Sequence, residues 1–336
     1  MKLINPSFEI WEQAPGLTGA LKQIEKVGRV CYKSENKITE DSYKKFVEDL
    51  TERGHGAMLE HGTLYFDIPL GSPLYDEMYL EKTSVINKFD KNKYSKVVSY
   101  VKKFIHDNEP TVAVEHYAIT TNYRAIIESD IDDETKDWIF KNYLCEVPND
   151  HHERRMTVHF TCDCGVAREF LRHRVFSMAQ ESTRYCNYSK SKFDGQLVFI
   201  KPNNWTNLNE GYYELTFDKN GHEIIHGDGY IKDVSEEGFD KESAFLYACL
   251  KDETIYMRLT EGFKCQAQEA REVLPLALKT EICMTGFMDD WDHFFSLRAR
   301  GTTGKPHPQA KELAEPLMNM FHGTGPKPAD TTDSPS

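Results

Sequence analysis

The side chains best suited to chemistry gather in one short segment, residues 168–185, which holds four arginines, one histidine and two serines. An arginine guanidinium can donate two parallel hydrogen bonds to a phosphate, and serine hydroxyls can donate to its remaining oxygens. The whole chain has 54 acidic and 41 basic residues, so a basic segment indicates a local anion site. From composition alone, the alternative is an exposed basic helix face that pairs with the surplus carboxylates.

The spacing of residues in and around this segment is more specific than its composition. Val175 to Glu181 separate an Arg-His-Arg triplet, residues 172–174, from Ser182, and Arg184-Tyr185 follows. Further motifs occur in order along the chain: Gly54-His55-Gly56 with Glu60-His61, Ala270-Arg271 with Leu274-Pro275, and Phe294-Phe295-Ser296-Leu297-Arg298. Coincidence does not explain an ordered set of this kind between residues 54 and 298.

This set of motifs resembles that of the flavin-dependent thymidylate synthases. The resemblance implies an enzyme that methylates dUMP to dTMP, with methylenetetrahydrofolate as carbon donor and FAD, reduced by NADPH, as hydride donor. It also implies a homotetramer whose FAD and dUMP sites gather residues from several subunits. In the conventional synthases a cysteine adds to the pyrimidine, and this chain has no Pro-Cys-His segment of the kind they use. The flavin route is therefore favoured.

The resemblance also implies the residues of the site. Those expected around dUMP are Glu169, Phe170, Leu171, Arg172, Gln180, Ser182, Thr183, Arg184, Arg271 and Arg298. Those expected around FAD are His55, Ala57, Arg172, His173, Arg174, Gln180 and His293. No metal is expected.

Two of these residues are the expected catalytic residues. Arg298 matches the arginine that favours ionisation of the pyrimidine at N3, a role that suits a group which stays protonated. Ser182, with Arg184, is expected to bind the dUMP phosphate. Ser182 is assigned a positioning role because a hydroxyl nucleophile needs an adjacent base.

Some positions depart from the family pattern or have a structural alternative. Glu169 stands where many relatives have Gln, Ala57 replaces a hydroxyl residue, and Phe287 falls where Asn is frequent. The structural alternatives are buried histidines for His55 and His61, an ion pair of Arg271 with Glu269 or Glu272, and core positions for Phe294 and Phe295. A metal site at Cys162 and Cys164 is the weaker alternative to burial, because zinc ligands within a pair usually lie two residues apart.

Two other classes of function compete with the flavin enzyme. The first is a nucleotide- or RNA-binding module that uses residues 168–184 without catalysis, and it would bind no flavin. The second is a dehydrogenase or a metal-dependent deaminase, but the chain lacks the combination of H-x-E with P-C-x-x-C and has neither GxGxxG nor GxxxxGK[ST]. The net charge of -13 argues against general affinity for nucleic acid or anionic lipid.

Composition also predicts where the protein works. No stretch approaches the roughly 18 apolar residues that a membrane span needs, and the first residues are too polar for a secretory signal. The eight cysteines are scattered along the chain, so we expect them to be reduced. A soluble, cytoplasmic protein is expected.

Hydrophobic periodicity predicts the elements that must position the motifs. Strands are expected at Ser7–Trp11, Leu64–Ile68, Tyr117–Thr121, Met156–Asp163 and Lys279–Met284. One helix is expected to end at Arg29. Further helices are expected over Thr39–Gly54, Tyr123–Ile127, Val166–Arg174 and Ser243–Leu274, and the last one runs to Arg298. Asn122 is the expected cap of the helix that begins at Tyr123, and Asp289 is the expected cap of the last helix.

Strands separated by amphipathic helices indicate an α+β (α/β layered) fold, in which helices flank a sheet that contains antiparallel strands. Residues 1–325 are expected to form one domain with insertions near 70–155 and 190–250. Within the insertions, residues 70–115 are expected to be irregular and residues 190–240 to form surface loops. The tail, residues 326–336, is expected to be disordered because it is rich in Pro, Asp, Thr and Ser.

Overall fold

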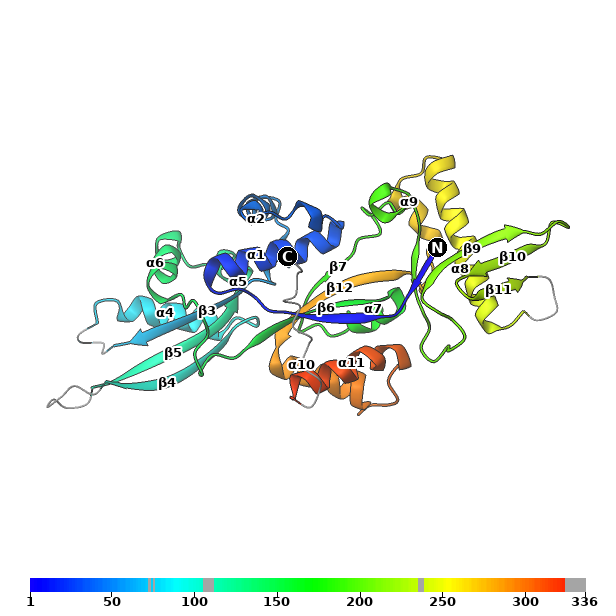
Figure 1. The fold of residues 1–336 in the computed structure, drawn as a ribbon. Coiled ribbons are helices and arrows are strands. Elements are labelled where there is room, and N and C mark those ends of the chain that lie inside the picture. Colours follow the sequence, from blue (N-terminus) through cyan, green and yellow to red (C-terminus); the bar gives the residue numbers. More distant parts are fainter. Residues whose placement is uncertain (72–73, 75, 105–111, 235–238, 324–336) are drawn as a thin grey trace, which may run out of the picture.

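The computed structural model describes residues 1–71, 74, 76–104, 112–234 and 239–323, so the predicted disordered tail lies outside the described residues. Three sheets follow one another along an elongated molecule, with helices on both sides of the central one (Figure 1). This confirms the predicted α+β class. Among the described residues, no helix combines the length and apolar character that crossing a membrane requires.

The central sheet carries the segments that contain most of the motifs. Its strands, in the order β2-β6-β12-β7, are all antiparallel: β2 (Ser7–Trp11), β6 (Arg155–Asp163), β12 (Lys279–Phe287) and β7 (Ser177–Gln180). Alternate residues of a strand point to opposite faces, so Val158, Phe160 and Cys162 all face one core. The sheet therefore fixes the chain on either side of the Arg-His-Arg triplet.

The helices on that core face are α7 (Cys164–Phe170), α10 (Met288–Phe295) and α11 (Pro308–Phe321). Phe294 and Phe295 are fully buried against the sheet, as expected for core positions. Trp291 lies between them and β6, and its indole nitrogen donates a hydrogen bond of 3.2 Å to the carbonyl of Met156. Each such side chain contributes about 1.5–3 kcal/mol by leaving water.

The opposite face of the central sheet packs against α1 (Gly16–Tyr32), which contacts β7 and β12. Three short elements follow α1 in the chain: a 3-10 turn Glu35–Lys37, α2 (Ser42–Glu52) and α3 (Gly56–Leu59). Val47 and Leu50 of α2 and Leu59 of α3 share a small core with Ile24. This packing places the Gly-His-Gly motif beside α1.

A separate three-stranded antiparallel sheet has the order β3-β5-β4, and two of its strands fall within residues 70–155, which were predicted to be an insertion. It consists of β3 (Thr63–Leu70), β5 (Val112–Asn122) and β4 (Lys96–Phe104), with α4 (Tyr79–Asp90), α5 (Tyr123–Ile127) and α6 (Asp133–Tyr143). Asn122 caps α5 as expected, since its side chain accepts a hydrogen bond from the amide of Ala125. The prediction that residues 70–115 are irregular is wrong, because α4 and β4 lie there. The strand β4 lies at the sheet edge and contains several lysines, which obscured its apolar pattern.

The second insertion extends the third sheet, whose order is β11-β10-β9-β1-β8. Its strands are β1 (Lys2–Ile4), β8 (Val198–Ile200), β9 (Gly211–Phe217), β10 (Glu223–Gly227) and β11 (Tyr230–Asp233), next to a 3-10 turn Ser191–Phe193. The prediction of surface loops over 190–240 is therefore wrong. Asn220-Gly221 and Asp228-Gly229 join the strands β9 to β11, and both glycines have positive φ, as tight hairpin turns require.

Three helix predictions also need correction. The helix expected over Ser243–Leu274 is shorter in the structure, where α8 covers Lys241–Met257. Three short elements follow α8: a π-helical turn (Arg258–Gly262), α9 (Ala267–Ala270) and a 3-10 turn (Arg271–Val273). The helix expected over Val166–Arg174 already ends at Phe170. Asp289 lies inside the first turn of α10, while Asp290 accepts the hydrogen bond from the amide of Phe287.

We expect Phe294→Ala to lower the free energy of unfolding by about 3–5 kcal/mol, because it empties the centre of the aromatic core. Urea unfolding at neutral pH measures this change. The control is Phe263→Ala, whose side chain is 66% exposed, so about 0.5 kcal/mol or less is expected. Equal effects of the two substitutions would contradict the assignment of the core.

Candidate active site

The Arg-His-Arg triplet lies in the loop between α7 and β7. Phe170 at the end of α7 and Phe176 just before β7 are both buried in the core of the central sheet. Residues 171–175 between them turn back over the surface, with the amide of His173 donating to the carbonyl of Phe170. The two buried phenylalanines thus hold an exposed loop that presents Arg172 and Arg174, whereas a continued helix would have carried these side chains away.

Arg298 joins this loop to the end of α10. It belongs to a π-helical turn, Ser296–Arg300, that directly continues the buried helix. Its Nη1 donates to Glu169 Oε2 at 2.7 Å, its Nη2 to the Glu169 carbonyl at 2.7 Å, and its Nε to His173 Nε2 at 3.0 Å. Glu169, His173 and Arg298 therefore form one hydrogen-bonded unit that joins the segment 168–185 to the end of α10.

These contacts define the protonation states of the unit. An arginine stays protonated, so His173 Nε2 must accept its hydrogen bond, which requires a neutral imidazole. Burial, Arg298 and His293 lower the pKa of His173 to about 4, which agrees with that requirement. Burial opposes ionisation of Glu169, but hydrogen bonding to Arg298 and the charge of Arg298 outweigh it and lower the pKa of this carboxyl. At neutral pH the unit is thus carboxylate, guanidinium and neutral imidazole.

A cavity of about 690 Å³ opens beside this unit. Its lining includes six of the residues expected at the site: Glu169, Arg172, His173, Arg174, His293 and Arg298. His293 projects from α10, and its ring centroid lies 6.2 Å from that of His173. Glu169 is the one carboxylate in this lining, so the cavity is strongly cationic.

The sequence analysis missed the opposite wall of this cavity, which is the loop Thr303–His307 ahead of α11. Lys305 and His307 come from this loop, and no motif marks them. The only sequence signal is the run Gly301-Thr302-Thr303-Gly304. Gly301 has a φ of 71°, and a Cβ there would lie 2.7 Å from the Gly304 carbonyl oxygen, so a side chain is excluded.

A second group of expected residues lies at the other end of β7. Gln180 ends the strand, and its side-chain amide donates a hydrogen bond to Thr280 Oγ1. Ser182 begins a helical turn, and the backbone amide of Ser182 donates to the Cys31 carbonyl. Glu181 anchors the turn, since its buried carboxylate accepts hydrogen bonds from Lys279 and Tyr188.

Arg184 and Arg271 meet α9 on the same side of the molecule. Arg184 Nε donates to Gln268 Oε1 at 3.2 Å, and Arg271 lies just beyond the end of α9. Arg271 pairs only loosely with Glu272, at 3.7 Å, and remains 43% exposed. The second group thus consists of Ser182, Thr183, Arg184 and Arg271.

The two groups do not meet within one chain. The four residues of β7, at about 3.3 Å each, place them roughly 10 Å or more apart, and none of the second group lines the 690 Å³ cavity. Phe170 is fully buried, so only its backbone is available to a ligand, whereas Leu171 is 39% exposed. One chain alone therefore presents the expected dUMP residues as two separate surfaces.

The Gly-His-Gly motif lies at a third place, distinct from the two groups described above. His55 is exposed and lines a cavity of about 550 Å³ with Tyr185 and with basic residues from α1 and from the segments that follow α1 and α2, and Ala57 is exposed nearby. His61, in contrast, is fully buried: its Nδ1 contacts Thr285 Oγ1 at 2.7 Å, and burial lowers its pKa to about 3. The structural alternative therefore holds for His61 and not for His55.

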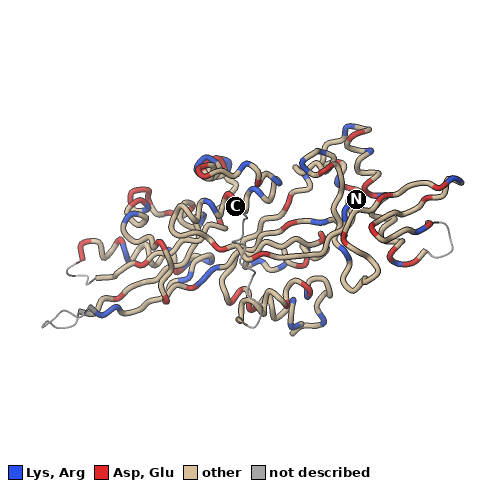
Figure 2. The backbone as a smooth tube through the Cα atoms, in the orientation of Figure 1, with Lys and Arg blue, Asp and Glu red and all other residues tan. Residues whose placement is uncertain are grey.

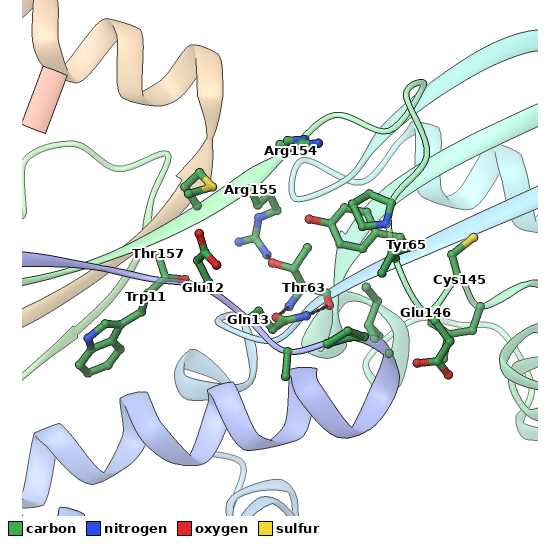
Figure 3. A pocket seen from close by; sticks show the side chains of 18 residues that line it. Trp11, Glu12, Gln13, Thr63, Tyr65, Cys145, Glu146, Arg154, Arg155 and Thr157 are labelled. Atoms are coloured by element: carbon green, nitrogen blue, oxygen red, sulfur yellow. Dashed lines mark hydrogen bonds between the residues drawn. The ribbon is translucent and has the colours of Figure 1, made fainter. Parts of the chain in front are cut away.

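Another cavity, of about 310 Å³, lies between β2, β3 and β6 and includes none of the expected site residues in its lining (Figure 3). Gln13 and Thr63 close one side of it with two mutual hydrogen bonds. Across the described ranges, His, Cys, Asp and Glu side chains form no group of three or more that is placed to hold a metal ion.

Comparison with known proteins follows this geometry. The family model described as "Thymidylate synthase complementing protein" matches residues 148–327. The chain is 27% identical over 168 residues to the flavin-dependent thymidylate synthase of Synechocystis sp., a match that covers 49% of this chain and 65% of the relative. It is 26% identical over 179 residues to the probable flavin-dependent thymidylate synthase of Paramecium bursaria Chlorella virus 1, covering 53% and 71%. The chain thus spans just under two thirds of the first relative.

Solved structures also resemble the chain at low identity. The UMP/dUMP methylase PolB from Streptomyces cacaoi, bound with 5-Br dUMP, has a TM-score of 0.40 at 14% identity and covers 97% of this chain and 93% of its own. Thymidylate Synthase X from Helicobacter pylori, with FAD and dUMP, has a TM-score of 0.34 at 12% identity and covers 94% and 92%.

We expect His173 to make stability depend on pH. The ordinary pKa of His is 6.5 and that of His173 is lowered to about 4, so the unfolded chain takes up the proton first. The stability due to neutral His173 is complete above pH 6.5 and is lost as the pH falls from 6.5 towards 4. With allowance for screening by solvent, the loss amounts to roughly 1–2 kcal/mol.

Urea unfolding between pH 4 and 7 of the wild type and of His173→Gln measures this contribution. The glutamine keeps a hydrogen-bond acceptor near Arg298 but does not titrate, and His61 contributes equally to both proteins. The variant should lose less stability on acidification than the wild type. Identical pH profiles would contradict the neutral His173 assignment.

Proposed function

Since this chain belongs to the thymidylate synthase complementing protein family, we propose that it is a flavin-dependent thymidylate synthase. In this proposal it converts dUMP to dTMP, with methylenetetrahydrofolate as carbon donor and FAD, reduced by NADPH, as hydride donor. The observation that carries the proposal is the convergence of Glu169 and His173 with Arg298, which is more than 120 residues away in the sequence, on one cationic cavity.

The cavity fits a flavin in size and in charge. Its volume of about 690 Å³ lies within the roughly 300–1,000 Å³ of small-molecule sites. Arg172, Arg174 and His293 would hold the flavin, and the two guanidiniums would favour its anionic reduced form. When bound, the flavin supplies the hydride that completes the methyl group. No metal is needed for this chemistry.

The residues of the chain itself bind and polarise the pyrimidine. Arg298 is only 14% exposed, and hydrogen bonds to Glu169 and His173 fix its orientation. In this proposal its charge is preorganised to stabilise the negative charge that develops on the uracil ring. Glu169 orients this guanidinium through two hydrogen bonds. As a carboxylate it can only accept hydrogen bonds, unlike the glutamine of many relatives.

The nucleotide phosphate is assigned to the second group. Ser182 and Thr183 supply hydroxyls, and Arg184 and Arg271 supply guanidiniums, which together match the acceptors of a phosphate monoester. Gln180 lies between the two groups at the end of β7 and can reach the nucleotide or the flavin.

The separation of the two groups supports a homotetramer with shared active sites. One dUMP could use both groups only if another copy of the chain brings its second group to the cavity. Apolar side chains beside the motifs are exposed in the single chain: Val175 by 54%, Tyr185 by 56% and Leu276 by 53%. Such exposure next to a polar site is typical of an interface between subunits.

The location proposed for the enzyme is the cytoplasm. All eight cysteines are free, which suits a reducing compartment. Acidic and basic residues are mixed over most of the chain (Figure 2), which gives no support to a general nucleic-acid-binding surface.

The purified protein should be yellow, should oxidise NADPH faster when dUMP is present, and should release tritium from carbon five of labelled dUMP. An absorbance spectrum and a stopped assay measure these properties. A colourless protein without NADPH oxidation would instead favour a binding module that uses residues 168–184.

We expect Arg184→Ala to weaken dUMP binding about 10- to 100-fold, because it removes charge-assisted hydrogen bonds worth about 1.5–3 kcal/mol. FAD binding should change less than threefold. Calorimetry with dUMP and flavin fluorescence measure the two affinities. The matched control is Arg168→Ala, an exposed arginine of the same segment with no expected ligand contact. If Arg184→Ala weakens both ligands equally, its assignment to the phosphate is wrong.

A further inference from the structure

A smaller cavity, of about 210 Å³, adjoins the candidate active site. Its walls come from the turn before β4, from the start of β6, from the loop before β7 and from the junction of β12 and α10. The residues that matter here are Lys93, Lys96, Arg155, Arg174, Val175 and Asp290. Lys93 and Lys96 belong to the first insertion and lie outside residues 148–327, the part that the family model matches.

The charges around this cavity do not balance. Four side chains are cationic, and Asp290 is the one carboxylate in the lining. Lys96 pairs with Asp289 at 2.6 Å, but Lys93 lies over the ring of Tyr94 instead of a carboxylate. In the part of the chain that the structure describes, Lys93, Arg155 and Arg174 have no carboxylate within ion-pair distance. The cavity therefore favours an anion.

Arg155 makes the imbalance costly. Its side chain is buried, with 7% of the residue exposed. The guanidinium donates only to neutral oxygens: the Glu60 carbonyl, Thr63 Oγ1 and Ser177 Oγ. Its Nε has no partner among the described residues. Burial lowers the pKa of Arg155 to about 10, although the charges of Glu60 and Asp290 act in the opposite direction. No described carboxylate forms a direct ion pair with this buried guanidinium, which is unfavourable.

Arg155 also lines the 310 Å³ cavity, but the charges there are better matched. Figure 3 shows Arg154 and Arg155 around that cavity together with the carboxylates of Glu12 and Glu146. The smaller cavity has no comparable supply of carboxylates. The missing anion is therefore expected on the side of Lys93 and Arg174.

The smaller cavity lies directly beside the 690 Å³ cavity, because Arg174 and Val175 line both. At about 210 Å³ it is smaller than the roughly 300 Å³ at which sites for whole small molecules begin, so it suits one end of a ligand. A phosphate carries one or two negative charges on a compact group, and it matches ammonium and guanidinium donors that converge from several directions.

We propose that Lys93, Lys96, Arg155 and Arg174 form a phosphate subsite for a nucleotide whose remaining part occupies the 690 Å³ cavity. The inserted sheet thereby adds two lysines to the site. That the ligand is a nucleotide rests on the proposed function, whereas anion binding at this position does not.

The full-length protein with Lys93→Glu tests the subsite. Lys93 is exposed and forms no ion pair with any residue that the structure describes, so the fold should tolerate the change. The matched control is Lys91→Glu, an exposed lysine two residues away that does not line the cavity but alters the net charge equally. Thermal unfolding should give the same midpoint for all three proteins.

Inorganic pyrophosphate is the probe, with its affinity measured by calorimetry. Lys93→Glu should bind it about tenfold more weakly than the wild type, and Lys91→Glu should stay within twofold. Three ligand pairs then identify the source of the phosphate: FAD and riboflavin, NADPH and dihydronicotinamide riboside, and dUMP and deoxyuridine. The phosphate-bearing member of one pair should lose affinity in Lys93→Glu while its partner is unchanged.

Two results would overturn the subsite: wild-type pyrophosphate affinity in Lys93→Glu, or an equal loss in Lys91→Glu, which would indicate a general charge effect. A yellow, active enzyme whose affinities ignore Lys93 would reject the subsite alone and leave the proposed function intact. If pyrophosphate binding depends on Lys93 in a protein without flavin or dUMP-stimulated activity, the anion site stands and the nucleotide assignment fails.

Discussion

The contact of the Arg298 guanidinium with the Glu169 carboxylate and the neutral His173 ring is the interaction on which the candidate site depends. It exists because α7 and α10 pack against one face of the central sheet, with Phe170 and Phe294 fully buried between them. That apolar packing brings residue 298 to residues 169 and 173. Charge, tautomer and cavity shape then follow from three hydrogen bonds, so the chemistry of the site rests on an aromatic core that itself touches no ligand.

The structure brings together several residues that the sequence analysis expected at the site, and the reason is physical. The motif residues lie beside buried aromatic positions with regular spacing, so both the elements and their inward faces could be predicted. Five of the seven residues expected at the flavin line a cavity: His55 lines the 550 Å³ cavity and the other four line the 690 Å³ cavity. The loop Thr303–His307 was not found, because Lys305 and His307 carry no pattern. Arg155 was not found either: next to Arg154 it reads as a surface residue at the start of a strand, and only the fold buries it.

The segments 70–155 and 190–250 were predicted to be insertions, but their strands and helices were not predicted. The strand β4 is a lysine-rich edge strand, and β9 to β11 are short strands joined by tight turns, so neither gave a long periodic signal. Their effects differ. The strands within 190–250 enlarge the sheet next to α8, and none of their residues lines the 690 Å³ cavity. The segment 70–155 places Lys93 and Lys96 against Arg174 and so bears directly on the surface beside the candidate active site.

A single chain holds the expected dUMP residues as two groups at opposite ends of β7, and the account joins them through a ligand bound where copies of the chain meet. The most direct measurement is a crystal structure of the full-length protein with FAD and dUMP. The account predicts a uracil ring within hydrogen-bond distance of Arg298, a flavin ring in the 690 Å³ cavity, and a 5′-phosphate on Ser182 and Arg184. Both ligands bound away from Arg298, or a phosphate remote from Ser182 and Arg184, would contradict it.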